Sequence, residues 1–327
     1  MKLATFQTSG GSPRIGIVHG SNTMLFDVAA AAKRAHLAAD AFDSMQCLID
    51  AGEPALDLAR RLIDARVNEE DLSLPVAAVE LLAPVPEPRQ MRDGMSFPRH
   101  IQQSQRGMRR LGAMGDPAAL AAIDAEPLSE IAEVYRQMPI YYLTNRLVVR
   151  GTGTTVRWPR YSRVMDFELE FGVFTRGTAA NIPAANAHKH IFGFTIFNDF
   201  SARDQQRLEM PGWLGPAKGK SFDGANVLGP WIVTPDEIGD PYHLSMEARV
   251  NGEVWTRNTS EGMLFSFEEM IAYMSRDETL HAGEFIGSGT VGNGCGLELG
   301  RFLQHKDLIE LEVERIGVLA NRVEQQS

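Results

Sequence analysis

The sequence predicts an α+β protein that is mostly β, and three regions carry that prediction. Residues 164–174 alternate acidic and apolar side chains, which is the period of two expected of a β-strand. Residues 191–197 form an apolar run of the length of a buried strand. Nearer the C-terminus, Asn251-Gly252 predicts a type I′ hairpin turn between two strands, and the segments 309–314 and 317–322 predict two more strands.

Composition and charge bound the possible functions. The chain has 327 residues and a formal charge of −10, which argues against a nucleic-acid-binding surface. It has neither an apolar run of membrane length nor the apolar core of a signal peptide. Its two cysteines, Cys47 and Cys295, make neither a disulfide framework nor a zinc cluster. We therefore expect a cytoplasmic protein that binds a small molecule and interacts with neither nucleic acid nor membrane.

Two domains are expected. Residues 1–83 predict a small α+β unit, with two short strands around a glycine turn and a helix that Asp27 caps. The following segment, LLAPVPEPRQ, contains three prolines that force an extended backbone. We place the domain boundary there, so that the larger domain covers residues 84–327.

The acidic residues of the first predicted strand suggest a metal site. Glu168 and Glu170 lie on the same strand face, about 6.5–7 Å apart, and can share one cation. Without a cation the two carboxylates would repel, and at least one would have a raised pKa. A solvated edge strand is the alternative for this pair alone. Asp199, which ends the buried run, favours the metal site.

Two further regions hold candidate functional groups. Residues 91–112 are polar and basic, with little apolar periodicity, so they predict either a mobile surface segment or a lid. This stretch includes Asp93, His100 and Arg109. Glu298 alternates with two leucines, which is compatible with an inward-facing or a solvated carboxylate.

Two motifs resemble a known family. FELEF at 167–171 and NDFSARDQQ at 198–206 resemble the most characteristic signatures of the fumarylacetoacetate hydrolase family. The resemblance covers roughly residues 84–327, and the N-terminal unit is compatible with it. It implies a mixed β-roll as the C-terminal domain, and it implies a homodimer.

The resemblance also implies a set of site residues. One divalent cation is expected, and Mg²⁺ is the first expectation, with Ca²⁺ or Mn²⁺ as alternatives, because an all-carboxylate site suits a hard cation. The implied metal ligands are Asp93, Glu168, Glu170 and Asp199. The implied catalytic residues are His100, Glu298 and Lys220, and the implied substrate-binding residues are Arg109, Gln206, Thr290 and Tyr141.

One departure from the family pattern concerns substrate contacts. Met95 and Met210 stand where relatives that cleave fumarylacetoacetate carry substrate-binding tyrosines. Either Tyr141 or Tyr142 is the candidate to replace part of that contact, and a less polar acyl end is expected in the substrate.

The implied function is a metal-dependent hydrolase that cleaves a C–C bond in a β-diketo acid of the acylpyruvate, fumarylacetoacetate or fumarylpyruvate type, in the catabolism of aromatic compounds. The substrate would be a small 2,4-dioxo acid. The alternatives are a 2-oxo-acid decarboxylase or an isomerase or tautomerase on the same metal site, and a non-catalytic metal-binding protein. The presence of both His100 and Glu298 favours the hydrolase, because decarboxylation needs no pair of residues to activate water.

Overall fold

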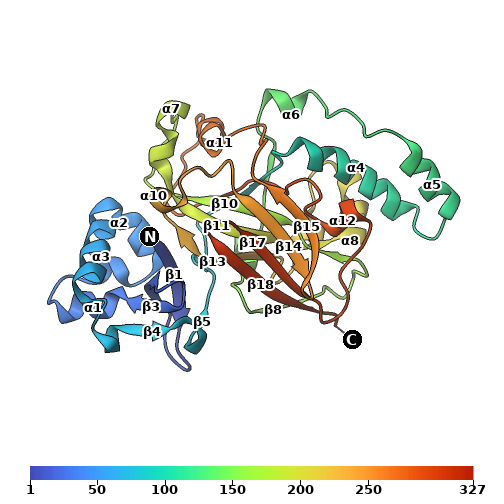
Figure 1. The fold of residues 1–327 in the computed structure, drawn as a ribbon. Helices are drawn as coiled ribbons and strands as arrows, with labels where there is room; N and C mark the ends of the chain where they lie inside the picture. The colour runs from blue at the N-terminus through green and yellow to red at the C-terminus, as the bar shows by residue number, and fades with distance from the viewer. Residues whose placement is uncertain (327) are drawn as a thin grey trace.

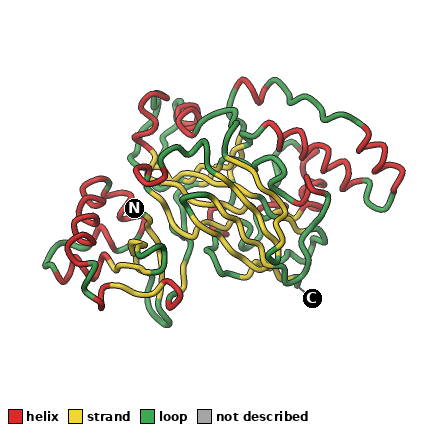
Figure 2. Tube along the Cα trace, in the orientation of Figure 1, coloured by secondary structure: helices red, strands yellow, loops and turns green. Residues whose placement is uncertain are grey.

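The computed structural model describes residues 1–326, and it confirms an α+β fold that is mostly β. Figure 2 shows the strands gathered in the middle of the molecule and most helices at its periphery. The strands are β1 (Lys2–Gln7), β2 (Arg14–His19), β3 (Met24–Asp27), β4 (Ser73–Pro75), β5 (Glu80–Leu81), β6 (Met91–Gly94), β7 (Tyr141–Leu143), β8 (Thr155–Arg157), β9 (Met165–Asp166), β10 (Leu169–Thr175), β11 (Ile191–Asp199), β12 (Ser201–Ala202), β13 (Asn226–Val233), β14 (Ser245–Val250), β15 (Glu253–Thr259), β16 (Phe285–Gly287), β17 (Leu308–Val313) and β18 (Gly317–Glu324). The α-helices are α1 (Val28–Arg34), α2 (Met45–Ala51), α3 (Glu53–Arg66), α4 (Pro98–Gly112), α5 (Pro117–Ala125), α6 (Val134–Gln137), α7 (Ala184–Ala187), α8 (Arg203–Glu209), α9 (Ala217–Lys220), α10 (Pro235–Ile238), α11 (Phe267–Met274) and α12 (Gly296–Leu299).

The strands form two large sheets and one small one. An eleven-stranded sheet has the order β4-β3-β2-β1-β13-β11-β10-β16-β6-β7, with β5 beside β1. A five-stranded sheet has the order β15-β14-β17-β18-β8, and β9 pairs with β12. Most neighbouring strands are antiparallel, whereas β16 and β6, and β18 and β8, are parallel pairs. Strand β10, which carries part of the acidic motif, is central in the large sheet.

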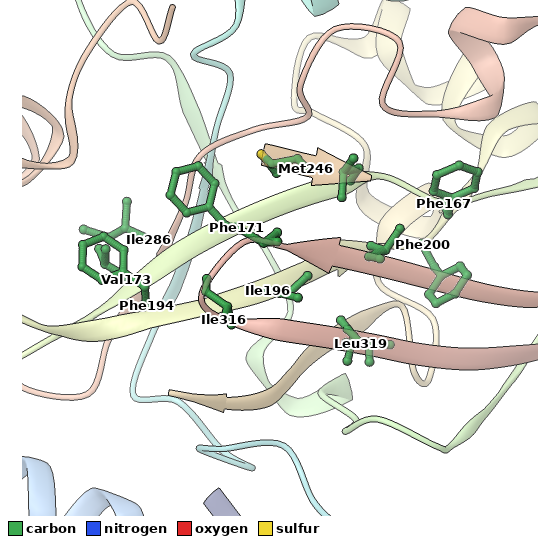
Figure 3. Close-up of a cluster of buried hydrophobic side chains, with 14 of the residues drawn as sticks. Phe167, Phe171, Val173, Phe194, Ile196, Phe200, Met246, Ile286, Ile316 and Leu319 are labelled. Carbon is green, nitrogen blue, oxygen red and sulfur yellow. The ribbon is translucent and has the colours of Figure 1, made fainter. Parts of the chain in front are cut away.

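The main hydrophobic core lies between the five-stranded sheet and the central strands of the large sheet (Figure 3). Phe171 and Ile196 project from the large sheet into this core, and Met246 and Leu319 project into it from the other sheet. A second cluster covers the opposite face of the large sheet, and it includes Phe174 as well as buried side chains of α1, α2 and α3. Strand β10 is therefore buried on both of its faces.

This burial decides between the two interpretations of the acidic pair. Glu168 is 4% exposed and Glu170 is 0% exposed. The alternative of a solvated edge strand is therefore wrong, because β10 has a hydrogen-bonded neighbour on each side and a hydrophobic layer on each face.

The N-terminal strands continue the large sheet (Figure 1). Strand β1 pairs with β13, with Leu3 opposite Ile232. The Asp27 side chain accepts a hydrogen bond from the backbone N–H of Ala30 and so caps α1 as expected. The boundary after residue 83 stays a prediction, and both the large sheet and the second core cluster run across it.

The hairpin prediction is confirmed, and the prediction for residues 91–112 is wrong. Asn251 and Gly252 both have positive φ, at 53° and 79°, as a type I′ turn between β14 and β15 requires. Residues 91–112 form the buried strand β6 and the fifteen-residue helix α4, not a mobile segment or lid. Helix α4 buries His100, Ile101, Gly107 and Leu111. Only two of these four, Ile101 and Leu111, are large apolar side chains, so the apolar pattern of the sequence did not show the helical period.

None of the helices within residues 1–326 has the length and hydropathy needed to cross a bilayer.

Candidate metal centre and active site

Four carboxylates from separate parts of the chain meet at one end of the large sheet. Asp93 lies on β6, Glu168 directly precedes β10, Glu170 lies on β10, and Asp199 ends β11. One oxygen of each lies within 4.8 Å of the corresponding oxygens of the other three. We call these four residues the carboxylate cluster. Its members come together because the strands that carry them lie close in the sheet order β11-β10-β16-β6.

A glycine makes room for one member of this cluster. Gly287 on β16 is the partner of Asp93 in the parallel pairing with β6. A Cβ atom at Gly287 would lie 2.4 Å from Oδ1 of Asp93. The glycine-rich segment 284–300 therefore serves, at this position, to let a carboxylate approach the backbone.

Burial makes it costly to ionise the whole carboxylate cluster. Burial and the neighbouring Asp199 raise the pKa of Asp93 to about 8. Burial and Asp93 raise the pKa of Glu170 well above its usual value, and burial raises that of Asp199 to about 6. Glu168 is the exception: burial opposes its ionisation, but the charges of Lys220 and Arg203 hold its pKa well below the usual range.

Within residues 1–326, three buried oxygens of the carboxylate cluster have no hydrogen-bond partner. They are Oδ1 of Asp93, Oε2 of Glu170 and Oδ1 of Asp199. Buried carboxylate oxygens are ordinarily hydrogen-bonded or bound to a cation, because an unpaired one loses its hydration without compensation. Unpaired oxygens on three members of the cluster fit a hard divalent cation, which takes oxygen ligands.

Two positively charged side chains contact the carboxylate cluster. Lys220 Nζ lies 2.7 Å from Glu168 Oε2 and 2.6 Å from Asp199 Oδ2. Arg203, which is fully buried, donates to Glu168 Oε1 at 2.8 Å and to Asp166 Oδ2 at 2.8 Å. Both oxygens of Glu168 are thus in ion pairs, whereas Glu170 contacts neither cation.

A histidine–glutamate pair lies beside the carboxylate cluster. His100 Nδ1 is 3.1 Å from Glu298 Oε1, and both side chains are buried. Glu298 lies on the short helix α12 and its side chain faces inward, which is one of the two alternatives that the sequence left open. Helix α12 is preceded by Cys295, whose backbone forms a β-bridge with Glu168. This bridge sets the histidine–glutamate pair next to the cluster.

Close packing of two helices holds the pair together. Helix α4 carries His100 and packs against α12, which carries Glu298. At Gly107 of α4, a Cβ atom would lie 2.6 Å from the carbonyl oxygen of Leu297. The absence of a side chain at Gly107 is therefore what lets the two helices approach.

Two of the expected substrate-binding residues lie at the site. Thr290 donates to Glu170 Oε1 at 3.0 Å. The amide oxygen of Gln206 accepts from Arg203 at 2.9 Å. Both contacts order a member of the carboxylate cluster, Thr290 directly and Gln206 through the Arg203 that binds Glu168.

The other two expected substrate-binding residues need correction. Arg109 is nine residues after His100 on α4, which is about 180° around the helix at about 100° per residue, so it faces solvent and pairs with Glu126. Tyr141 alternates with Tyr142 along β7, so the two face opposite sides. The Tyr142 hydroxyl donates to Asp199 Oδ2, and it is Tyr142 that reaches the site.

Sequence reasoning missed two groups. Asp166 is fully buried and accepts from the backbone N–H groups of Gly296 and Leu297, at 2.7 and 2.8 Å, as well as from Arg203. It thus ties the start of α12 to the carboxylate cluster. Its place in the same alternation as Glu168 was the available signal. Arg203 lies inside the NDFSARDQQ motif, which was the available signal, but no role was assigned to it.

Residues 92–324 match the family model described as the fumarylacetoacetate (FAA) hydrolase C-terminal domain. This chain belongs to the fumarylacetoacetate hydrolase family. The match covers more than half of the chain and includes all four members of the carboxylate cluster, both members of the histidine–glutamate pair, and Lys220.

Family members similar to this chain have several activities. The human mitochondrial oxaloacetate tautomerase FAHD2A is 31% identical over 283 residues, covering 86% of this chain and 79% of the relative. The structure of a fumarylacetoacetate hydrolase from Exiguobacterium antarcticum has a TM-score of 0.72 at 26% identity, over 100% of both chains. A maleylpyruvate hydrolase from Sphingobium sp. SYK-6, solved with manganese(II) and pyruvate, has a TM-score of 0.71 at 22% identity, over 100% of both chains, and shows the common fold. The family is thus one of enzymes that includes hydrolases and tautomerases.

Proposed function

We propose that this member of the fumarylacetoacetate hydrolase family is a divalent-cation-dependent hydrolase that cleaves a C–C bond in a small 2,4-dioxo acid of the acylpyruvate type. One observation carries the proposal: a buried pair of His100 and Glu298 lies next to a buried cluster of four carboxylates. The cluster suits a cation that binds the oxygens of a 2-oxo acid, and the pair suits the activation of water. Catabolism of aromatic compounds is the proposed setting.

A divalent cation held by Asp93, Glu168, Glu170 and Asp199 would supply a Lewis acid that orients the 2-oxo acid and stabilises negative charge on its enolate oxygen. Mg²⁺ is the proposed cation, with Ca²⁺ or Mn²⁺ as alternatives, because all four ligands are carboxylates. The manganese(II) in the related maleylpyruvate hydrolase supports a divalent ion.

The histidine–glutamate pair transfers the proton between water and the substrate. Glu298 accepts a hydrogen bond from Nδ1–H of His100, which leaves the other ring nitrogen to accept a proton. His100 removes a proton from water, and the hydroxide oxygen bonds to the distal carbonyl carbon. The C–C bond then breaks, the acyl group leaves as a carboxylic acid, and the protonated His100 returns its proton to the enolate carbon to give pyruvate.

Two further side chains stabilise charge. Burial opposes protonation of Lys220, but Asp199 and Glu168 raise the pKa of Lys220 above its usual value, so this residue acts as a fixed positive charge and not as a base. Gln206 has its amide oxygen held by Arg203, which leaves its amide nitrogen as a donor to a substrate oxygen. Together they are placed to stabilise the developing oxyanion.

The second candidate is keto–enol tautomerisation of a 2-oxo acid such as oxaloacetate. It is favoured by the similarity to the human oxaloacetate tautomerase across most of this chain. The same histidine–glutamate pair would move a proton between carbon and oxygen, and no bond between carbons would break.

Product analysis separates these candidates. The purified protein with Mg²⁺ is given a panel of acylpyruvates and, separately, enol-oxaloacetate, while enol absorbance is followed and products are quantified. The proposal predicts equal amounts of pyruvate and a carboxylic acid, with activity lowered about 10²–10⁴-fold in His100→Ala. Ketonisation of oxaloacetate with unchanged acylpyruvates would establish the tautomerase instead, and release of carbon dioxide would establish a decarboxylase.

A further inference from the structure

We propose that His100, Cys295 and Glu298 form a second metal site, suited to a borderline cation such as Zn²⁺, whose occupation stops catalysis. One donor atom of each residue, a ring nitrogen, the thiol sulfur and a carboxylate oxygen, lies within 4.8 Å of the other two. His100 is 4% exposed and Cys295 is 0% exposed. The carboxylate of Glu298 is also buried.

The short helix α12 holds two of the donors on one side. Cys295 is the N-cap of α12, and Glu298 is the third helical residue. Glu298 Oε2 accepts from the backbone N–H of Cys295 at 3.2 Å and lies 3.5 Å from its sulfur. Residues three apart at a helix start face the same way, so the thiol and the carboxylate converge.

The third donor comes from α4. His100 is held by the close packing of α4 on α12 at Gly107 and by its contact with Glu298. All three donors therefore stand on elements fixed by backbone packing, and a cation could bind with only small side-chain movements.

The donor types separate this site from the carboxylate cluster. Sulfur, nitrogen and oxygen together are a set that zinc binds, whereas four carboxylates suit a hard cation such as Mg²⁺. Zinc bonds of about 2.0–2.3 Å imply donors about 3.3–3.8 Å apart in a tetrahedron, so the present spacing, which is 4.8 Å at most, needs to close by about 1.5 Å or less. Three protein donors leave the fourth position for water or a substrate oxygen.

Binding would remove the groups that move the proton. The Cys295 thiol would release its proton to solvent as the sulfur binds the cation, and a lone pair of His100 and an oxygen of Glu298 would be taken up. The inhibition rests on the proposed role of His100 and Glu298 in catalysis. The binding of the cation does not depend on that catalytic role.

Cobalt(II) gives a direct test of binding, because cobalt bound to a thiolate shows a near-ultraviolet charge-transfer band that cobalt bound to oxygen alone lacks. The full-length protein is first saturated with Mg²⁺ and then titrated with Co²⁺. We expect this band at one equivalent in the wild type and in the control Cys47→Ser, and its loss in Cys295→Ser, since serine is a good N-cap and should preserve α12. No band in the wild type, or a band that persists in Cys295→Ser, would overturn the site.

Zinc inhibition tests the consequence. With Mg²⁺ saturating, the zinc concentration that halves activity should rise about 100-fold in Cys295→Ser relative to its own zinc-free rate, and should not change in Cys47→Ser. A cobalt band without zinc inhibition would overturn the inhibitory role and the catalytic role of His100 and Glu298 together, while the binding site itself would stand.

Discussion

Glu168 and Glu170 share one strand motif, yet their surroundings differ. Glu168 has both oxygens in ion pairs with Lys220 and Arg203, and its pKa lies well below the usual range. Among the residues that the structure describes, Glu170 has no positively charged partner and one of its oxygens has no hydrogen-bond partner, and its pKa lies well above the usual value. A bound divalent cation should therefore stabilise the ionised form of Glu170 more than that of Glu168.

The first prediction concerns Arg109. Arg109→Ala should leave the activity towards the preferred substrate within about twofold of wild type, because its side chain is exposed and pairs with the exposed Glu126. Steady-state kinetics measure this. Gln206→Ala is the matched comparison and should lower kcat, since Gln206 is buried beside the cluster. If kcat falls equally in both variants, Arg109 takes part in the reaction and the prediction is wrong.

At this scale the sequence predicted side-chain types better than their directions. The carboxylate cluster and the histidine–glutamate pair were named from motifs, because their residue types and spacing carry the chemistry. Arg109 was misplaced because a spacing along the chain does not show the helix that turns it away from His100. Tyr141 was chosen over Tyr142 because the register of β7 against β6 depends on a contact between distant segments.

Among the elements, α12 is short and depends on one buried side chain. Asp166 accepts from two backbone N–H groups at its start and from Arg203. Gly296 allows this approach, because a Cβ there would lie 2.6 Å from Oδ1 of Asp166. The same carboxylate thus orders the helix of Glu298 and the arginine that binds Glu168.

The second prediction follows. Asp166→Ala should lower the free energy of unfolding by about 3–5 kcal/mol, because it leaves the charge of Arg203 buried with one partner fewer and removes the acceptor of two backbone N–H groups at the start of α12. Urea denaturation measures this. Asp124→Ala, which breaks the exposed pair with Arg110, should change stability by about 1 kcal/mol or less. Similar losses in the two variants would contradict the role given to Asp166.

Long periodic strands were predictable, and α4 was not. The alternation at 164–174 and the turn at Asn251-Gly252 are local signals. The structure has the turn as predicted, and it divides the predicted strand into β9 and β10, with a break at residues 167–168. Helix α4 uses His100 and Gly107 on its buried stripe, so a pattern based on apolar residues does not detect it. These are the positions where a catalytic group and a close helix contact replace ordinary core residues.

For the whole molecule, the large sheet links the N-terminal strands to the carboxylate cluster. Strand β1 pairs with β13, which pairs with β11, the strand that ends at Asp199. The second core cluster, which includes side chains of α1, α2 and α3 as well as Phe174 and Phe197, extends from the N-terminal helices to the same strands. Binding at the cluster should therefore stabilise the sheet as a whole.

The third prediction is that a divalent cation stabilises the folded protein. At 100 times its dissociation constant, Mg²⁺ should add about 2.7 kcal/mol, and a chelator should remove this, which lowers Tm by several degrees. Differential scanning calorimetry with and without chelator measures the shift. Glu170→Gln should show a much smaller shift. If the Tm of the wild type changes with neither Mg²⁺ nor chelator, this would argue against a metal at the carboxylate cluster.

The central claim is that two neighbouring groups divide the work, with the carboxylate cluster holding the cation and the histidine–glutamate pair moving the proton. It is tested most directly by measuring metal affinity and turnover together in Glu170→Gln and Glu298→Gln. We predict that both variants lose turnover, that Glu170→Gln binds metal about 100-fold or more weakly, and that Glu298→Gln binds metal as the wild type does. Wild-type metal affinity in Glu170→Gln, or wild-type turnover in Glu298→Gln, would contradict this account.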